Sequence, residues 1–258
     1  MGKRYVTVVG ILGEPESGKT AALASLYLLV ANAKLAGWSF ADSHSLLGFE
    51  DIARGSRQWN LGNPPDQMTV HTHLPDERRP GFLHLRLRRD TDHRRVDLAL
   101  PDLPGEWTQG LVRTSKWERL NFLQSADAIW IFADGRALAD KQKKQALILR
   151  LGQLAGRLNA SMPEGVPKLI LVMTHRDAVE VPSATIDRIR DVFAKDGLKF
   201  ESVAIASFAK RGAGIKPGHG LKELIDATTA ASKQALPFWL PSEPTEGQRS
   251  YLAYRRNR

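Results

Sequence analysis

The sequence predicts an α/β protein: a three-layer α/β/α sandwich built on a mostly parallel six-stranded sheet with one antiparallel edge strand. Apolar segments of strand length alternate with helical segments along most of the chain, which favours a parallel sheet covered by helices on both faces. Two strands near the front are separated by a short turn, and this hairpin supplies the antiparallel strand. With 258 residues, 42% of them hydrophobic, the chain can bury one large core.

Each element is predicted from the spacing of its apolar residues. The six expected strands span residues 5–12, 82–88, 95–101, 126–133, 168–173 and 200–206. The expected helices span residues 21–36, 45–57, 120–123, 141–158, 183–195 and 221–235. Leucines alternate with polar residues through 82–88, so this segment is expected to be the half-exposed edge strand.

The stretch between the first strand and the first helix fits the pattern G-x-x-x-x-G-K-[ST], which is typical of a phosphate-binding P-loop. We expect it to contact a nucleotide through Gly13, Glu14, Pro15, Glu16, Ser17, Gly18, Lys19, Thr20 and Ala21. The glycines permit the backbone to approach the phosphates closely. Lys19 is expected to reach the β- and γ-phosphates, and the Thr20 hydroxyl to bind Mg²⁺. A chance match is the alternative, but the flanking strand and helix argue against it.

Polar motifs also follow the third strand and the last two strands of the predicted sheet. Asp102 can hold Mg²⁺ through a water beside Thr20, and Gly105 can offer its backbone N–H to a γ-phosphate. The same Asp-Leu-Pro-Gly sequence is also an ordinary turn. Because ligands of such sheets bind outside the carboxyl ends of the strands, we expect these motifs to meet the P-loop at one rim.

Thr174, His175 and Asp177 form the expected base-recognition motif. Guanine presents two neighbouring donors that one carboxylate can accept, whereas adenine presents an acceptor there, so Asp177 is expected to select guanine. The alternative is that Asp177 caps a helix. Ser207 and Phe208, after the last strand, are expected to support the base.

These motifs, in this order and spacing, resemble those of Ras-like P-loop GTPases of the translation-factor-related class, over about residues 4 to 235. Within that class, the Asp-Leu-Pro-Gly-Glu sequence and the long segment before the hairpin are similar to the bacterial double-GTPase group of conflict and defence loci. The resemblance implies GTP/GDP and Mg²⁺ as ligands. The sequence departs from the family pattern at Thr174 and His175, where the family usually has Asn and Lys.

The resemblance also implies a switch threonine and a water-positioning residue. Thr69 and Thr72 are the candidates for the threonine that senses Mg²⁺ and γ-phosphate, and Thr69 is preferred because it follows a Pro-rich loop. Glu106 corresponds to the water-positioning glutamine of Ras. Its carboxylate can orient water but also repels the phosphate oxygens, so hydrolysis is expected to be slow. The expected catalytic residues are therefore Lys19, Glu106 and Thr69.

Three functions compete at this point. The leading hypothesis is a GTP-driven molecular switch with slow hydrolysis that regulates a partner protein through its switch segments in a bacterial system. The alternative is a nucleotide-bound interaction module with little or no hydrolysis. A P-loop kinase ranks third, because the motif ending at Asp177 would then lack a purpose.

Composition sets the remaining expectations. The net charge is +9, which solvated faces explain and which makes nucleic acid a possible but not an indicated partner. Cysteine is absent, and neither a signal peptide nor a membrane span is recognisable, so a cytoplasmic location is expected. We expect a GTPase domain over residues 1–236, with an enlarged switch I region at about 37–80, and a basic, Pro-containing tail over 237–258.

Overall fold

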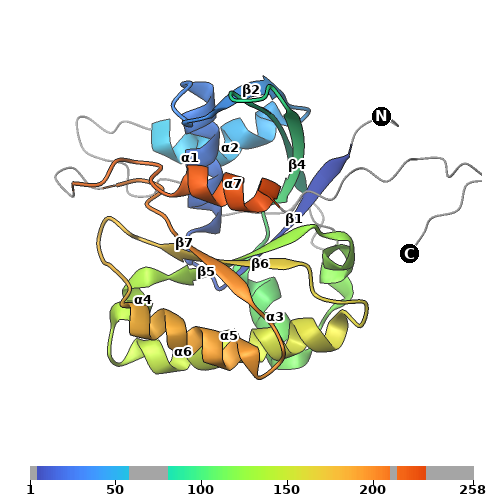
Figure 1. Cartoon of the computed structure of the whole chain (residues 1–258), viewed down its shortest axis with the longest axis vertical. Helices are drawn as coiled ribbons and strands as arrows, with labels where there is room; N and C mark the ends of the chain where they lie inside the picture. The colour runs from blue at the N-terminus through green and yellow to red at the C-terminus, as the bar shows by residue number, and fades with distance from the viewer. Residues whose placement is uncertain (1–4, 58–80, 210–213, 231–258) are drawn as a thin grey trace, which may run out of the picture.

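The computed structural model describes residues 5–57, 81–209 and 214–230, which form a helix–sheet–helix sandwich (Figure 1). Within these residues, the strands are β1 (Val6–Gly13), β2 (Trp38–Asp42), β3 (Phe82–Arg89), β4 (Arg95–Pro101), β5 (Ala128–Asp134), β6 (Lys168–Thr174) and β7 (Phe200–Ala204). They form one sheet in the order β2-β3-β4-β1-β5-β6-β7. The α/β class and the mostly parallel sheet are confirmed.

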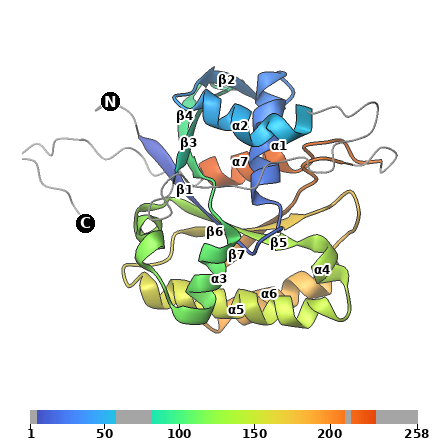
Figure 2. The same ribbon diagram turned by 180° about the vertical axis from the view of Figure 1, so that it is seen from behind.

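Helices cover both faces of this sheet. They are α1 (Lys19–Ala31), α2 (Leu46–Arg57), α3 (Gly105–Thr114), the 3₁₀ helix η1 (Glu118–Ser125), α4 (Gly135–Ala139), α5 (Lys143–Ser161), α6 (Ser183–Ala194) and α7 (Leu221–Ala230). Helices α1, α2 and α7 lie on one face, and α3 to α6 lie on the other (Figures 1 and 2). No described helix combines the length and the apolar character that crossing a membrane requires.

The central strands are apolar on both sides because each face of the sheet carries its own core. Ile11, Trp130 and Phe132 belong to the buried cluster under α1, α2 and α7. Ile129 and Ile131, which alternate with them along β5, belong to the second cluster, under α3, α5 and α6. The parallel register of β1, β4, β5, β6 and β7 brings their carboxyl ends to one rim of the sheet.

The expected number of strands was wrong, because the sheet has seven strands and its edge is β2. Residues 38–42, which belong to none of the expected strands, pair antiparallel with β3. Strand β3 therefore lies inside the sheet, antiparallel to both β2 and β4. Part of its polar face is covered, since His84 and Arg86 contact the buried carboxylate of Asp97 at 2.9 and 2.6 Å, whereas Arg88 is exposed. His84, Arg86 and Asp97 therefore form a charged cluster on the face of β3 that the sequence predicts to be exposed to solvent.

The helices also differ from the expectation, since α4 has no predicted counterpart and α5 runs to Ser161. Helix α1 ends at Ala31, five residues before the expected end, because Ala33 adopts a left-handed backbone with φ of 52°. Helix α3 was not predicted, since the Pro-Gly sequence at its start is typical of a turn. The expected tail over 237–258 lies outside the described residues.

Candidate functional site

The P-loop connects β1 to α1 at the carboxyl rim of the sheet. Gly18 stands at the N-cap of α1 with φ of 92°, a left-handed conformation that favours glycine. A Cβ atom on Gly18 would lie 3.1 Å from Cγ2 of Thr174, so the loop packs against the end of β6. Ser17 is buried, and its backbone N–H donates to the carbonyl of Glu14 at 3.2 Å. The motif therefore forms the compact turn that precedes a helix N-terminus, an arrangement suited to an anion.

Lys19 is folded into the P-loop and is only 6% exposed. Its ammonium donates to the carbonyls of Gly13 at 3.0 Å and Glu14 at 2.8 Å. Burial lowers the pKa of Lys19 to about 8, although the charges of Asp102, Glu106 and Glu14 favour the protonated form. The cation that should meet the phosphates is thus held beside the loop by two carbonyl oxygens.

Thr20 and Asp102 are brought together as a pair of hard oxygen donors. The Thr20 hydroxyl donates to the buried Asp102 carboxylate at 3.0 Å. A hydroxyl and a carboxylate side by side are a donor set that Mg²⁺ accepts, usually completed by waters and phosphate oxygens. Three or more His, Cys, Asp or Glu side chains do not cluster as a metal site anywhere in the described residues. The pair therefore fits a magnesium ion shared with a nucleotide rather than a metal bound by protein alone.

The segment after Asp102 begins α3 directly against the P-loop. A Cβ atom on Gly105 would lie 2.2 Å from the backbone nitrogen of Pro15, so only glycine permits this approach. The next residue, Glu106, is exposed in the first turn of α3, and its charge acts on Lys19. The structure thus places Glu106 where its charge reaches the P-loop lysine.

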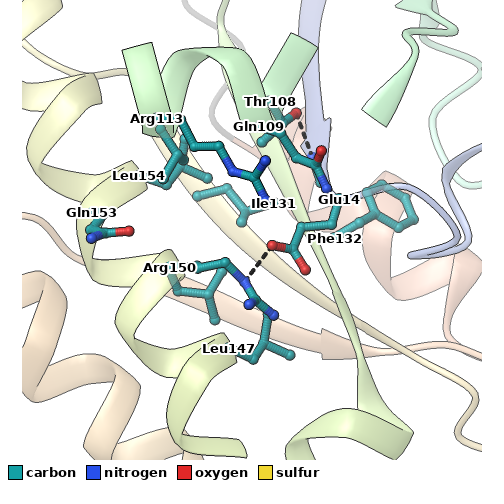
Figure 3. Close-up of a pocket in the computed structure, with 13 residues that line it drawn as sticks. Glu14, Thr108, Gln109, Arg113, Ile131, Phe132, Leu147, Arg150, Gln153 and Leu154 are labelled. Carbon is teal, nitrogen blue, oxygen red and sulfur yellow. Dashed lines mark hydrogen bonds and ion pairs between the residues drawn. The ribbon is translucent and has the colours of Figure 1, made fainter. Parts of the chain in front are cut away.

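Two contacts that the sequence did not predict attach the P-loop to the helices behind it. The buried Thr108 hydroxyl accepts a hydrogen bond from the backbone N–H of Gly13 at 3.1 Å. The carboxylate of Glu14 forms an ion pair with Arg150 of α5. Both contacts border a pocket of about 90 Å³ between α3 and α5, over which Gln109 and Arg113 extend (Figure 3). Thr108 and Arg150 belong to no sequence motif, so their contacts with the P-loop become visible only from the packing of α3 and α5.

The base-recognition motif lies in the turn after β6. Arg176 donates its backbone N–H to the carbonyl of Ile205 at 3.0 Å, which fixes this turn to the end of β7. His175 adopts a left-handed backbone with φ of 59°. The charges of Glu16 and Asp177 both act on Arg136, so the P-loop and the base-recognition turn face a common region.

Asp134, at the end of β5, is not among the predicted site residues. It pairs in register with Thr174 and forms an ion pair with His175 at 3.1 Å. Burial opposes ionisation of Asp134, but hydrogen bonds from His175 and Arg136 outweigh it and hold the pKa of the Asp134 carboxyl well below its usual range. Its position at the carboxyl rim was the signal that could have found it.

The remaining predicted residues lie at the edges of this site. Ser207 accepts a hydrogen bond at its carbonyl from the buried Ser25 of α1 at 2.7 Å, and Phe208 packs against the core under α1. Ala21 lies in the first turn of α1. Thr69 and Thr72 lie outside the described residues.

The sequence matches the Double-GTPase 2 family over residues 7–229. No curated protein matches the chain. Among solved structures, the chain is similar to the signal recognition particle receptor SRb-GTP/SRX complex from Chaetomium thermophilum, with 16% identity, 86% of this chain and 98% of that chain covered, and a TM-score of 0.43.

Two further solved structures are similar to the chain. The first is the Arl6 BBS3 small GTPase from Trypanosoma brucei with bound GppNp, with 13% identity, 88% and 100% coverage and a TM-score of 0.45. The second is translation elongation factor SelB from Methanococcus maripaludis in complex with GppNHp, with 15% identity and a TM-score of 0.37. In that case the similarity covers 93% of this chain and 37% of the other.

Proposed function

The chain belongs to the Double-GTPase 2 family, and we propose that it is a GTP-binding molecular switch with slow intrinsic GTP hydrolysis. The observation that carries this proposal is the convergence of the P-loop, the Thr20–Asp102 pair and the turn that holds Asp177 at one rim of the sheet. Each of these recognises a different part of a magnesium-bound guanine nucleotide. A guanine nucleotide with Mg²⁺ is the ligand class that would use the P-loop, the Thr20–Asp102 pair and the Asp177 turn together.

Nucleotide binding requires Lys19 to exchange its partners. In the structure its ammonium is held by two neutral carbonyl oxygens. Phosphate oxygens carry full charge and offer this cation stronger contacts than a carbonyl does. The backbone N–H groups at the start of α1 add further donors to the phosphates.

The metal site follows from the Thr20–Asp102 pair. These two side chains would hold Mg²⁺, the hydroxyl directly and the carboxylate through water. When bound, the ion neutralises charge that develops on the phosphate oxygens during hydrolysis.

Glu106 is the side chain proposed to orient the attacking water. It follows Gly105, whose contact with Pro15 brings the start of α3 to the phosphate loop. Phosphoryl transfer depends mainly on positioning and charge neutralisation. A carboxylate near the γ-phosphate helps to position the attacking water, but its negative charge opposes charge neutralisation. This balance motivates slow hydrolysis that a protein partner accelerates. Thr69 completes the switch in the proposal, as the residue that senses Mg²⁺ and γ-phosphate.

A nucleotide-bound interaction module with little hydrolysis is the second candidate. Glu106 and His175 motivate it, because they stand where the Ras-like pattern has the water-positioning glutamine and the lysine of the guanine motif. Either function implies a cytoplasmic protein that contacts a partner through residues 60–72 and 102–119, and the setting proposed is a bacterial conflict or defence system.

One experiment tests the shared premise and separates the two functions. Denaturing the purified protein and identifying the released nucleotide should yield GDP or GTP. Single-turnover hydrolysis of loaded GTP should then proceed over minutes to hours. GTP that persists for many hours would favour the interaction module, and release of adenine nucleotide would contradict both.

A further inference from the structure

A carboxylate that belongs to none of the nucleotide motifs contacts an imidazole and a guanidinium beside the base-recognition turn. Asp134 contacts Nδ1 of His175 through Oδ1 at 3.1 Å. The same carboxylate accepts from Arg136, with Nε at 3.1 Å from Oδ1 and Nη2 at 2.9 Å from Oδ2. Its Oδ1 also accepts the backbone N–H of Arg136 at 2.9 Å, which caps α4. Asp134 thus connects the ends of β5 and β6.

The contacts of His175 define which ring nitrogen carries the proton. The Thr174 hydroxyl donates to the carbonyl of Ala133 at 3.3 Å, and its oxygen lies 2.9 Å from Nδ1 of His175. An ionised carboxylate can only accept, so Nδ1 must donate to Asp134. We therefore assign a proton to Nδ1.

The backbone around this contact is held tightly. Asp134 pairs with Thr174 across β5 and β6. A Cβ atom on Gly135 would lie 2.3 Å from the carbonyl oxygen of Thr174, so the two strand ends approach as closely as glycine allows. Side-chain exposure is 25% for Asp134 and 31% for His175, which places the pair at the wall of the site rather than in open solvent.

We propose that Asp134 is a positioning residue of the guanine site, which fixes the imidazole of His175 on the base-recognition turn. This inference rests on the proposed function. A lysine at position 175 carries its own charge on a long stem, whereas a histidine has a short ring with two different nitrogens. The ring needs a partner that selects its tautomer and orientation, and Asp134 supplies that partner.

A double-mutant cycle tests whether Asp134 acts through His175. The variants are Asp134→Ala, His175→Ala and the double variant, each titrated with a fluorescent GDP analogue. We expect each single change to weaken binding by about tenfold, as for loss of one partly exposed charge-assisted contact. The double variant should be no weaker than either single one, because both changes remove the same interaction. Losses that multiply to about a hundredfold would overturn the proposal.

Two further variants separate positioning from folding. Asp140→Ala removes a carboxylate that also caps a helix, accepting from Gln142 and Lys143 at the start of α5, and it should leave affinity within about twofold of wild type. Asp134→Asn keeps the α4 cap and an acceptor oxygen, so it should recover part of the affinity. If Asp134→Ala does not fold, Asp134→Asn takes its place in the cycle.

The outcomes also distinguish this proposal from the function on which it rests. Wild-type protein that binds the GDP analogue, with Asp134→Ala and Asp134→Asn both within twofold of it, contradicts only the role of Asp134. Wild-type protein that binds no guanine nucleotide contradicts both. A ratio of GDP to IDP affinity that stays at the wild-type value in Asp134→Ala supports the proposal, because the amino group that differs between them is read by Asp177.

Discussion

Lys19 carries the first prediction at the residue scale, because its surroundings set a pH limit on binding. Burial lowers the pKa of Lys19 to about 8, and the charge of bound phosphate oxygens should raise that pKa again. The free protein thus loses a proton that the complex keeps. Affinity for a triphosphate should be constant below about pH 8 and fall about tenfold per unit above it.

Calorimetric titration at pH 7 and pH 9, in buffers of different ionisation enthalpy, measures both the affinity and the proton uptake. Lys19→Ala removes the cation and should abolish binding at both pH values. Affinity of wild-type protein that is equal at the two pH values would show that Lys19 does not titrate with the nucleotide.

Asp177 carries the prediction about base selection. Changing Asp177 to Asn replaces one acceptor oxygen with a donor amide, which can bind the carbonyl that xanthine has in place of the guanine amino group. The variant should weaken GTP by at least about tenfold and prefer XTP. Competition of both nucleotides against a fluorescent analogue measures the preference. An unchanged ratio of GTP to XTP affinity would show that Asp177 does not contact the base.

Glu106 carries the prediction about hydrolysis. Its side chain is exposed in the first turn of α3, so Glu106→Ala should reduce the single-turnover rate by about 100-fold or more without changing GTP affinity. Glu106→Gln keeps an oxygen that can orient water and should retain a good part of the activity. An alanine variant that hydrolyses GTP as fast as wild type would place Glu106 outside the reaction.

At the scale of elements, the contact between α3 and the P-loop makes two glycines of one helix behave differently. Gly105→Ala would place a methyl group 2.2 Å from the Pro15 nitrogen, and backbone on both sides must move. The start of α3 should then be displaced from the phosphates, so hydrolysis should fall while GTP still binds. Gly110→Ala is the matched control, since a Cβ atom there meets nothing within 4 Å.

The control variant should stabilise the protein by about 0.5–1 kcal/mol, because alanine favours a helix interior over glycine. It should hydrolyse GTP at the wild-type rate. Single-turnover rates and thermal unfolding of both variants decide the matter. Equal rates in Gly105→Ala and Gly110→Ala would show that the approach of α3 to Pro15 is not needed for the reaction.

The same elements show where sequence reasoning stops. The P-loop and the turn after β6 were predictable because their chemistry fixes residue types at fixed spacing. Strand β2 was not, since its five residues become a strand only by pairing with β3. Asp134 acquires a role only from the register that places it beside Thr174. Such pairings join residues far apart in the chain, and no local pattern records them.

At the scale of the whole molecule, the sheet divides two hydrophobic cores, and the site lies at the rim that both cores support. The α/β class, the parallel order and the covering helices were predictable from alternating apolar segments. The position of β3 inside the sheet was not, because the charged cluster around the buried Asp97 makes an interior strand resemble an exposed one. The alternating pattern predicts an exposed strand because polar residues are usually solvated, and paired charges that are buried are the exception.

A rim that joins both cores should transmit nucleotide binding to the stability of the entire domain. A ligand at 100 times its dissociation constant stabilises the folded state by about 2.7 kcal/mol, or about 5–10 °C in melting temperature for a chain of this size. GDP or GTP with Mg²⁺ should produce this shift, and ATP should not. Lys19→Ala should lose the shift.

Ile189→Val, deep in the core under α6, is the control. It should lower the melting temperature yet keep the shift, since it costs about 0.5–1.5 kcal/mol far from the P-loop. Differential scanning fluorimetry compares all three proteins, and a shift with ATP equal to that with GTP would refute guanine selection by the folded chain.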